Sequence, residues 1–298
     1  MSEFKEWEAK EHANEWLIFP DNMGKCLSID EVALSKGELY TIVSNKKAKG
    51  KKGTIVAIIA TTKAETVIKH LLKIPFSKRK KVKEITLDMA NSMKFISKRC
   101  FPKAIQVTDR FHVQKLAIEA LQQIRIQYRW EAIDLENDLI KQARAKGETY
   151  SPITLLNGDT LKQLLARSRY LLYKSPANWS DQQEARAKIL FEHYPDVKKA
   201  FRLVNNLRQI FNSCKSIEIA YTRLAHWYKE VEESGFKAFN TIANSIKLNY
   251  RSILNYFINR STNASAESFN AKIKAFRAQF RGVRNKEFFL FRLTQIYA

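Results

Sequence analysis

The chain has 298 residues, of which 45% are hydrophobic and 11% aromatic, so it can build a packed core and is not globally disordered. Its formal net charge of +22 predicts a polyanionic partner. The longest apolar run, Ile55 to Ala60, is far shorter than the roughly 20 residues that cross a bilayer. Because no secretion signal is visible either, we expect a soluble intracellular protein that does not contact membranes.

The first part of the chain predicts a sheet. Short β-branched runs, bounded by turn residues, are typical of strands and are found at 25–32, 39–44, 54–60, 83–87 and 104–107. The first three predict an antiparallel meander. Apolar residues at helical spacing in 63–72 and 92–100 then separate the later strands. After a lead-in of residues 1–24, the predicted order over residues 25–112 is β-β-β-α-β-α-β.

The rest of the chain predicts helices. Residues 113–259 show long amphipathic spacing, and residues 260–298 predict a C-terminal helix. This order matches an α/β protein of the ribonuclease-H-like fold, with a mixed five-stranded sheet and a large all-helical insertion before the last helix. In that fold the first strand lies beside the fourth at the centre of the sheet.

Aspartates stand at the ends of three predicted strands. Asp30 interrupts an apolar strand, whereas Asp88 and Asp109 each follow one. Because the carboxyl ends of such strands meet in one crevice, Asp30 is expected beside Asp88, with Asp109 one strand further out. Adjacent carboxylates repel each other unless a divalent cation lies between them. The alternative is structural: Asp30 ends its strand and Asp88 caps the next helix.

A third carboxylate, Glu267, lies on the C-terminal helix. At about 100° per residue, Phe269, Ile273 and Phe276 point away from Glu267 and are expected to pack on the sheet. Three converging carboxylates can hold two Mg²⁺ or Mn²⁺ ions, roughly 3.5–4 Å apart, which suits phosphodiester chemistry. The alternative is an ordinary first-turn glutamate that the helix dipole favours.

The chain resembles the DDE transposases of ISL3-type bacterial insertion sequences in five runs: Ser28–Val32 (SIDEV), Ile85–Met89 (ITLDM), Phe101–Ala104 (FPKA), Val107–His112 (VTDRFH) and Ser261–Lys274 (STNASAESFNAKIK). The resemblance implies a metal-dependent enzyme that cleaves DNA at transposon ends and transfers the strand to target DNA. It implies Asp30, Asp88 and Glu267 as catalytic and metal-binding residues, and Asp109 with His112 as a C/D-x-x-H motif. Asp109 remains the rival of Asp88 as second catalytic aspartate.

The resemblance also raises questions about partners. Family members usually carry an N-terminal zinc-binding and helix-turn-helix module, whereas about 24 residues precede the first predicted strand here. The module is expected to be a separate chain, or this copy is truncated. A homo-oligomer is expected, as for other transposases. The alternative function is a truncated or domesticated DNA-binding remnant without transposition activity.

Basic residues gather in two runs and on the last helix. Lysine or arginine contacts with phosphate release counterions and favour DNA binding, although a solvated surface is the simpler interpretation of each run. The predicted DNA-binding residues are Lys46, Lys47, Lys51, Lys52, Lys78, Arg79, Lys80, Lys81, Arg110, Asn270, Lys274 and Arg281.

Overall fold

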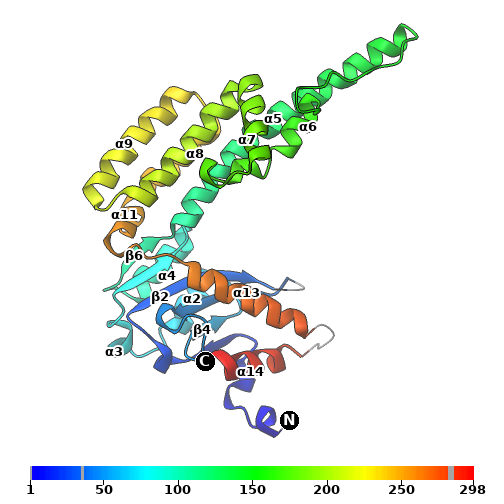
Figure 1. The fold of residues 1–298 in the computed structure, drawn as a ribbon. Coiled ribbons are helices and arrows are strands. Elements are labelled where there is room, and N and C mark those ends of the chain that lie inside the picture. The colour runs from blue at the N-terminus through cyan, green and yellow to red at the C-terminus, as the bar shows by residue number, and fades with distance from the viewer. Residues whose placement is uncertain (1, 35–36, 281–284) are drawn as a thin grey trace. The chain divides into compact units, whose positions relative to one another are not determined.

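The computed structural model describes residues 2–34, 37–280 and 285–298. Two compact units make up the chain (Figure 1). The first, here called the sheet unit, comprises Met1–His112 and Asn249–Ala298, and the second, the helical unit, comprises Val113–Leu248. The chain therefore leaves the sheet unit once and returns to it.

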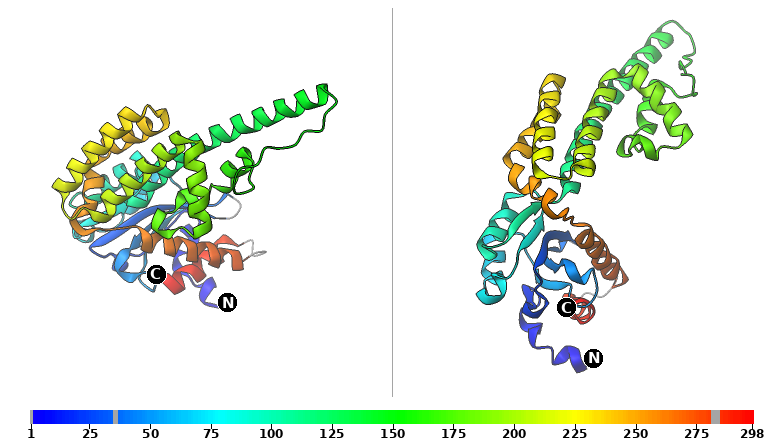
Figure 2. Two further views of the ribbon diagram at one scale, coloured as in Figure 1. Left: turned by 45° about the horizontal axis from the view of Figure 1, so that its top comes forward. Right: turned by 60° about the vertical axis from the view of Figure 1, so that its left-hand side comes forward.

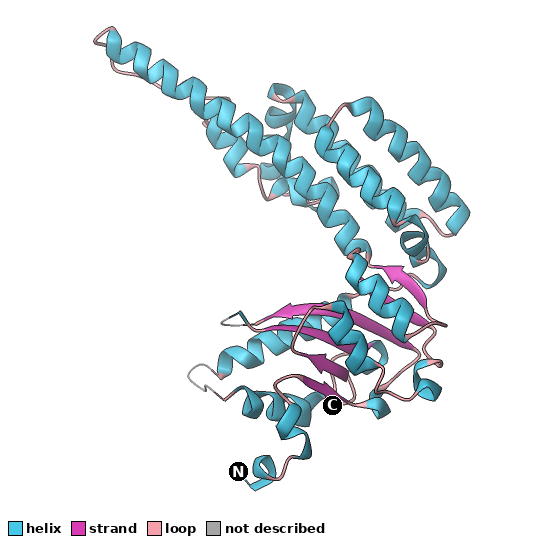
Figure 3. Cartoon of the chain, turned by 180° about the vertical axis from the view of Figure 1, so that it is seen from behind, coloured by secondary structure: helices cyan, strands magenta, loops and turns pink. Residues whose placement is uncertain are grey.

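The described residues of the sheet unit form one six-stranded mixed sheet, which is drawn in magenta in Figure 3. In spatial order its strands are β1 (Trp16–Ile18), β4 (Ile55–Ile59), β3 (Leu39–Asn45), β2 (Cys26–Ala33), β5 (Glu84–Leu87) and β6 (Ile105–Thr108). The expectation of five strands is corrected to six, because β1 pairs with the edge of β4. With only three residues, β1 is too short to show the alternation that reveals a strand.

Pairing in the sheet follows the predicted strand order. Strands β2, β3 and β4 form the antiparallel meander, and β5 runs parallel to β2 with Ser28 opposite Thr86. Strand β6 runs parallel to β5, with Leu87 opposite Thr108. The first predicted strand, β2, therefore lies beside the fourth, β5, and the carboxyl ends of three parallel strands face one edge.

Helices cover both faces of this sheet. Because side chains alternate along a strand, Leu27 and Ile29 of β2 pack with α2 (Ala64–Leu71) and α4 (Asn91–Cys100). Val32 points to the other face, where Phe269 and Ile273 of α13 (Ala264–Gln279) and residues of α14 (Lys286–Tyr297) complete a second core. The predicted apolar stripe of the C-terminal segment does pack on the sheet. That segment forms two helices rather than one.

Shorter helices complete the sheet unit: α1 (Ser2–Lys5), α3 (Phe76–Arg79), α11 (Tyr250–Leu254) and α12 (Tyr256–Asn259). We expected the helical block to extend to residue 259, whereas α11 and α12 belong to the sheet unit. The reason is their contact with β6. The hydroxyls of Ser252 and Thr108 lie 2.7 Å apart, and the Asn255 amide donates to the carbonyl of Gln106 at 2.8 Å.

The helical unit is built from long helices. Helix α5 (Arg110–Ala145) begins in the sheet unit, and the others are α6 (Leu161–Arg167), α7 (Asp181–His193), α8 (Pro195–Ser213), α9 (Ile217–Ser234) and α10 (Lys237–Leu248). Helices α8 and α9 lie side by side (Figure 2), and the Trp227 indole donates to the carbonyl of Leu203 between them. No described helix combines the length and apolar character that a membrane span requires.

Candidate active site

Three aspartates stand in register at one edge of the sheet. Asp30 and Asp88 each lie two residues beyond the Ser28–Thr86 pair, and they are close enough for the charge of Asp88 to contribute to the raised pKa of Asp30. One residue beyond the last pair of β5 and β6, Asp88 stands opposite Asp109, whose amide donates to the carbonyl of Leu87 at 3.0 Å. The parallel pairing of β2, β5 and β6 therefore gathers three carboxylates that lie far apart in sequence.

Backbone and side-chain donors orient two of these carboxylates. Asp30 accepts the amide of Glu31 on Oδ1, at 2.9 Å, and the side chain of Asn270 on Oδ2, at 2.7 Å. Asp88 accepts the amide of Ala90 at 2.8 Å, which places it in the turn before α4. Asn270, which the sequence predicted as a DNA contact, is thus a partner of a candidate catalytic residue.

Asp109 has an oxygen without a partner. Its side chain is only 1% exposed, and its Oδ1 accepts the amide of Phe111 at 3.4 Å. Its Oδ2 is buried and has no hydrogen-bond partner in the described part of the chain. Burial of an unpaired carboxylate oxygen is costly, so this atom is suited to a cation that would complete its surroundings.

Helices α5 and α13 bring two further ligand groups to Asp109. One donor atom each from Asp109, His112 and Glu267 lies within 4.8 Å of the other two. His112 is in the first turn of α5, and Glu267 is in the first turn of α13. Glu267 therefore lies beside Asp109 and His112, the two residues of the predicted C/D-x-x-H motif. Asp109 also belongs to the sheet edge where the three aspartates stand, which we call the aspartate edge.

The carboxylates influence one another's protonation. Burial raises the pKa of Asp30, and the negative charge of Asp88 adds to this, whereas the hydrogen bonds from Glu31 and Asn270 oppose it. Burial also raises the pKa of Glu267, followed by repulsion from Asp109, while His112 lowers it. This is the electrostatic setting of a divalent-cation site, because a bound cation would relieve both burial and repulsion. The carboxylate oxygens suit Mg²⁺ or Mn²⁺.

A buried polar network holds the segment that leads into α13. The ammonium of Lys46 donates to Thr86 at 2.6 Å and to Ser261 at 3.0 Å, and it lies 3.5 Å from the carboxylate of Glu84. Asn263 is hydrogen-bonded to Ser28 of β2. These contacts fix the start of α13 on the sheet and so position Glu267. Ser28 and Asn263 both lie in the runs that carry the family resemblance, but their contact with each other was not predicted, although a serine inside an apolar strand was a visible signal.

The structure separates the predicted DNA-binding residues into two groups. Arg79 is buried, and its guanidinium donates to the carbonyls of Ile74 and Cys100. The ammonium of Lys46, whose side chain is 13% exposed, is held in the network described above. These two positions do not fit contact with DNA. The exposed members are Lys47, Lys51, Lys52, Lys80, Lys81 and Lys274. Lys78 pairs with Asp21, and Arg110 lies over the ring of Tyr256. Arg281 lies outside the described residues.

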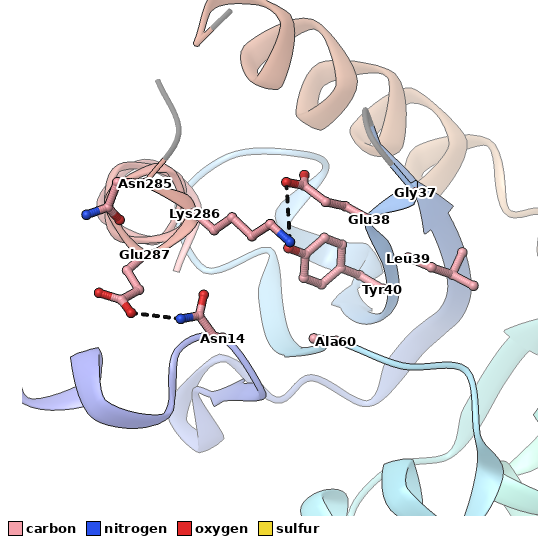
Figure 4. A pocket seen from close by; sticks show the side chains of 9 residues that line it. All are labelled: Asn14, Gly37, Glu38, Leu39, Tyr40, Ala60, Asn285, Lys286 and Glu287. Carbon is pink, nitrogen blue, oxygen red and sulfur yellow. Dashed lines mark hydrogen bonds and ion pairs between the residues drawn. The ribbon is translucent and has the colours of Figure 1, made fainter. Parts of the chain in front are cut away.

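A separate hollow of about 750 Å³ lies at the start of α14 (Figure 4). At its wall, Glu38 is 6% exposed and accepts two bonds from the buried guanidinium of Arg277, at 2.7 and 3.0 Å. The ammonium of Lys286 reaches the same carboxylate at 3.9 Å. Glu38 is thus already neutralised, and this hollow has none of the carboxylates of the aspartate edge.

Comparison with known proteins identifies the class of protein that combines this sheet and this acidic edge. A family model described as a transposase, of the DDE type, matches residues 27–293. The chain belongs to the ISL3 family of DDE transposases.

Individual relatives share low sequence identity with this chain. The transposase of insertion sequence IS1001 from Bordetella parapertussis is 24% identical over 91% of this chain, and that of IS1557 from Mycobacterium tuberculosis is 28% identical over 60%. The chain spans 60% and 39% of the lengths of these two relatives. Among solved structures, the Drosophila P element transposase strand transfer complex aligns with 97% of this chain and 79% of its own, with 14% identity and a TM-score of 0.35.

Proposed function

We propose that the sheet unit is the ribonuclease-H-like catalytic core of a transposase that cleaves DNA at transposon ends and joins the freed strand to target DNA. The observation that carries this proposal is the register that places Asp30, Asp88 and Asp109 at one sheet edge, where α13 adds Glu267. Strand order supports it, since β2 lies between its antiparallel neighbour and the parallel pair β5 and β6. The helical unit is then an insertion between β6 and α13.

Asp30, Asp88 and Glu267 are the residues that we propose to hold two divalent cations. Such ions, when bound, supply an activated water or 3′-hydroxyl and stabilise the leaving oxygen. The orphaned Oδ2 of Asp109 and the imidazole of His112 extend the same donor set around Glu267. Asn270 keeps one oxygen of Asp30 in a fixed direction, and the Lys46 network keeps α13 in place.

The remaining partners are also proposals. We propose that a separate zinc-binding, helix-turn-helix chain recognises the transposon end, the alternative being that this copy is truncated. Assembly into a homo-oligomer would bring two transposon ends together. Since the proposed substrate is bacterial DNA, the protein is expected to work in the cytoplasm.

The test is cleavage of labelled DNA that carries the inverted repeats flanking the gene, with Mg²⁺ or Mn²⁺ and with any neighbouring helix-turn-helix chain added. The cleavage rate should fall by more than about 100-fold in each of the variants D30N, D88N and E267Q. Loss of a residue that only contacts a metal ligand typically costs up to about 100-fold, so loss of a ligand itself should cost more. D134N, at an exposed position of α5, is the matched control.

Comparison of D88N with D109N decides which is the second catalytic aspartate. Loss of cleavage in D109N but not in D88N would reverse the assignment. Cleavage that survives both D30N and E267Q would contradict the proposed site. A wild-type protein that binds the DNA but never cuts it, with either metal, would favour the DNA-binding remnant.

A further inference from the structure

Two lysine runs that are far apart in sequence meet at the amino-terminal end of β2. They line one side of an open hollow of about 740 Å³, together with the loop that precedes β2. Five lysines contribute to its lining: Lys25, Lys46, Lys47, Lys78 and Lys81. Asp21 is the one acidic residue among its lining residues. We call this hollow the lysine groove.

The lysine groove lies away from the aspartate edge. Lys25 immediately precedes β2, whereas Asp30 lies five residues further along the same strand. At about 3.3 Å per residue this separation is roughly 16 Å, more than a lysine side chain can reach. Lys25 therefore does not reach the phosphate that the carboxylates would act on.

Three of the five ammonium groups are available to a ligand. Lys46 is held by Glu84 and Thr86, and Lys78 pairs with Asp21. Lys25, Lys47 and Lys81 are exposed, and the described residues offer them no ion pair within 4.0 Å. Such a concentration of uncompensated positive charge favours an anion.

Further exposed lysines neighbour those that line the groove. The amide of Lys83 donates to the carbonyl of Lys25 at 2.8 Å, so that these two exposed lysines are neighbours. Three more exposed lysines follow Lys47 in its turn: Lys49, Lys51 and Lys52. A row of this kind fits successive phosphates of a backbone better than one small anion.

We propose that the lysine groove binds the backbone of duplex DNA at a distance from the cleavage site, adding affinity without taking part in the chemistry. The choice of DNA rests on the proposed function. Contacts of this type neutralise phosphates and carry no sequence information. The groove would therefore strengthen binding to any duplex.

Cys26 provides a test in the wild-type protein. It lines the groove and is half-buried, whereas Cys100 and Cys214 are buried. N-ethylmaleimide should modify Cys26 first. A 30-base-pair duplex without transposon sequence, at about ten times its Kd, should slow this modification about tenfold, because about nine-tenths of the protein is then bound. An unchanged rate at saturating duplex would overturn the proposal.

Charge reversal provides a second test. K25E/K47E/K81E is compared with K63E/K98E/K103E, which changes the net charge equally at exposed lysines outside the groove. By fluorescence anisotropy, the groove variant should reduce the slope of log K against log salt by about 2.7, or 0.9 for each of three phosphate contacts. If both variants lost the same affinity for the DNA duplex, the result would contradict the proposal. A loss of affinity that is seen only with an RNA hairpin of similar size would also contradict it.

Cleavage assays separate this proposal from the proposed function. The groove variant should raise the KM for DNA and leave the rate at saturating DNA unchanged, whereas D30N should bind like the wild type and not cut. If the wild type never cuts but the binding results hold, the groove stands and the catalytic proposal fails. If cleavage is normal and the groove variant binds like the control, only the groove is wrong.

Discussion

Asn270 and Asp30 are joined by a 2.7 Å hydrogen bond, although 240 positions separate them in the chain. The bond ties α13 to β2 directly beside the acidic edge. N270A should reduce the cleavage rate about 10- to 100-fold and weaken activation by Mn²⁺, because a partner that orients a ligand is lost. Q279A, an exposed change on the same helix, should leave both unchanged. Normal metal activation in N270A would mean that Asp30 needs no such partner.

The metal-free protein should gain stability when Glu267 is neutralised. The pKa of Glu267 is raised by burial and by Asp109, so the folded chain holds this proton more tightly than the unfolded chain. The favourable contribution is complete below the ordinary glutamate pKa and is lost as the pH rises through the raised value. In EDTA, E267Q should therefore unfold at higher urea than the wild type at pH 7, with a smaller difference at pH 4.

An exposed carboxylate gives the comparison for this pH effect. E65Q, on the surface of α2, should shift the urea midpoint little at either pH. Added Mn²⁺ should reverse the order of wild type and E267Q at pH 7, because only the wild type keeps the complete ligand set. If E267Q is less stable than the wild type in EDTA at pH 7, then burial and repulsion from Asp109 do not destabilise the charged form of Glu267, and the prediction is wrong.

Lys46 should prove important for stability. Its ammonium faces Glu84, whose side chain is only 3% exposed, so K46M would leave a carboxylate buried without its cation. The expected loss in urea unfolding is about 3 kcal/mol. K46M/E84Q should recover part of that loss, since the buried charge is then absent. A double variant less stable than K46M alone would indicate that Lys46 acts through packing and not through Glu84.

The ion pair at the start of α14 offers an internal comparison. Arg277 is buried and binds Glu38 with two hydrogen bonds, whereas Lys286 is 53% exposed and 3.9 Å from the same carboxylate. R277A should cost about 3 kcal/mol of unfolding free energy, and K286A less than about 1 kcal/mol. Equal losses in thermal or urea unfolding would show that the two cations share the carboxylate evenly.

The sequence was informative where local pattern and strand pairing coincide. The predicted element order matched the ribonuclease-H-like fold, in which the first strand lies beside the fourth, and this led to the expectation of Asp30 beside Asp88. The parallel pairing of β2 with β5 agrees with that strand order. The three-residue strand β1 was missed, since so short a run carries no periodicity. Gly282, which lies outside the described residues, did indicate an interruption of the last helical segment, and the structure has two helices there, α13 and α14.

The details of the acidic edge depend on tertiary contacts that no local pattern reveals. Glu267 lies close to Asp109, and its position depends on the contacts of Asn263 and Lys46, which fix the start of α13 on the sheet. Likewise, a lysine run does not disclose that Lys46 turns inward, because its partner Glu84 is on a strand 38 residues away. Arg79 is hidden for the same reason, since its acceptors lie partly at the end of α4.

The division of the sheet unit into two stretches of sequence has a consequence for synthesis. Asp30, Asp88 and Asp109 leave the ribosome before the helical unit, and Glu267 follows only after it. A nascent chain thus carries most of the acidic edge throughout the synthesis of the helical unit without the glutamate that completes it. Under the proposed assignment, the ability to break DNA arises only after the helical unit has been made, and shorter partial products are harmless to the genome that encodes them.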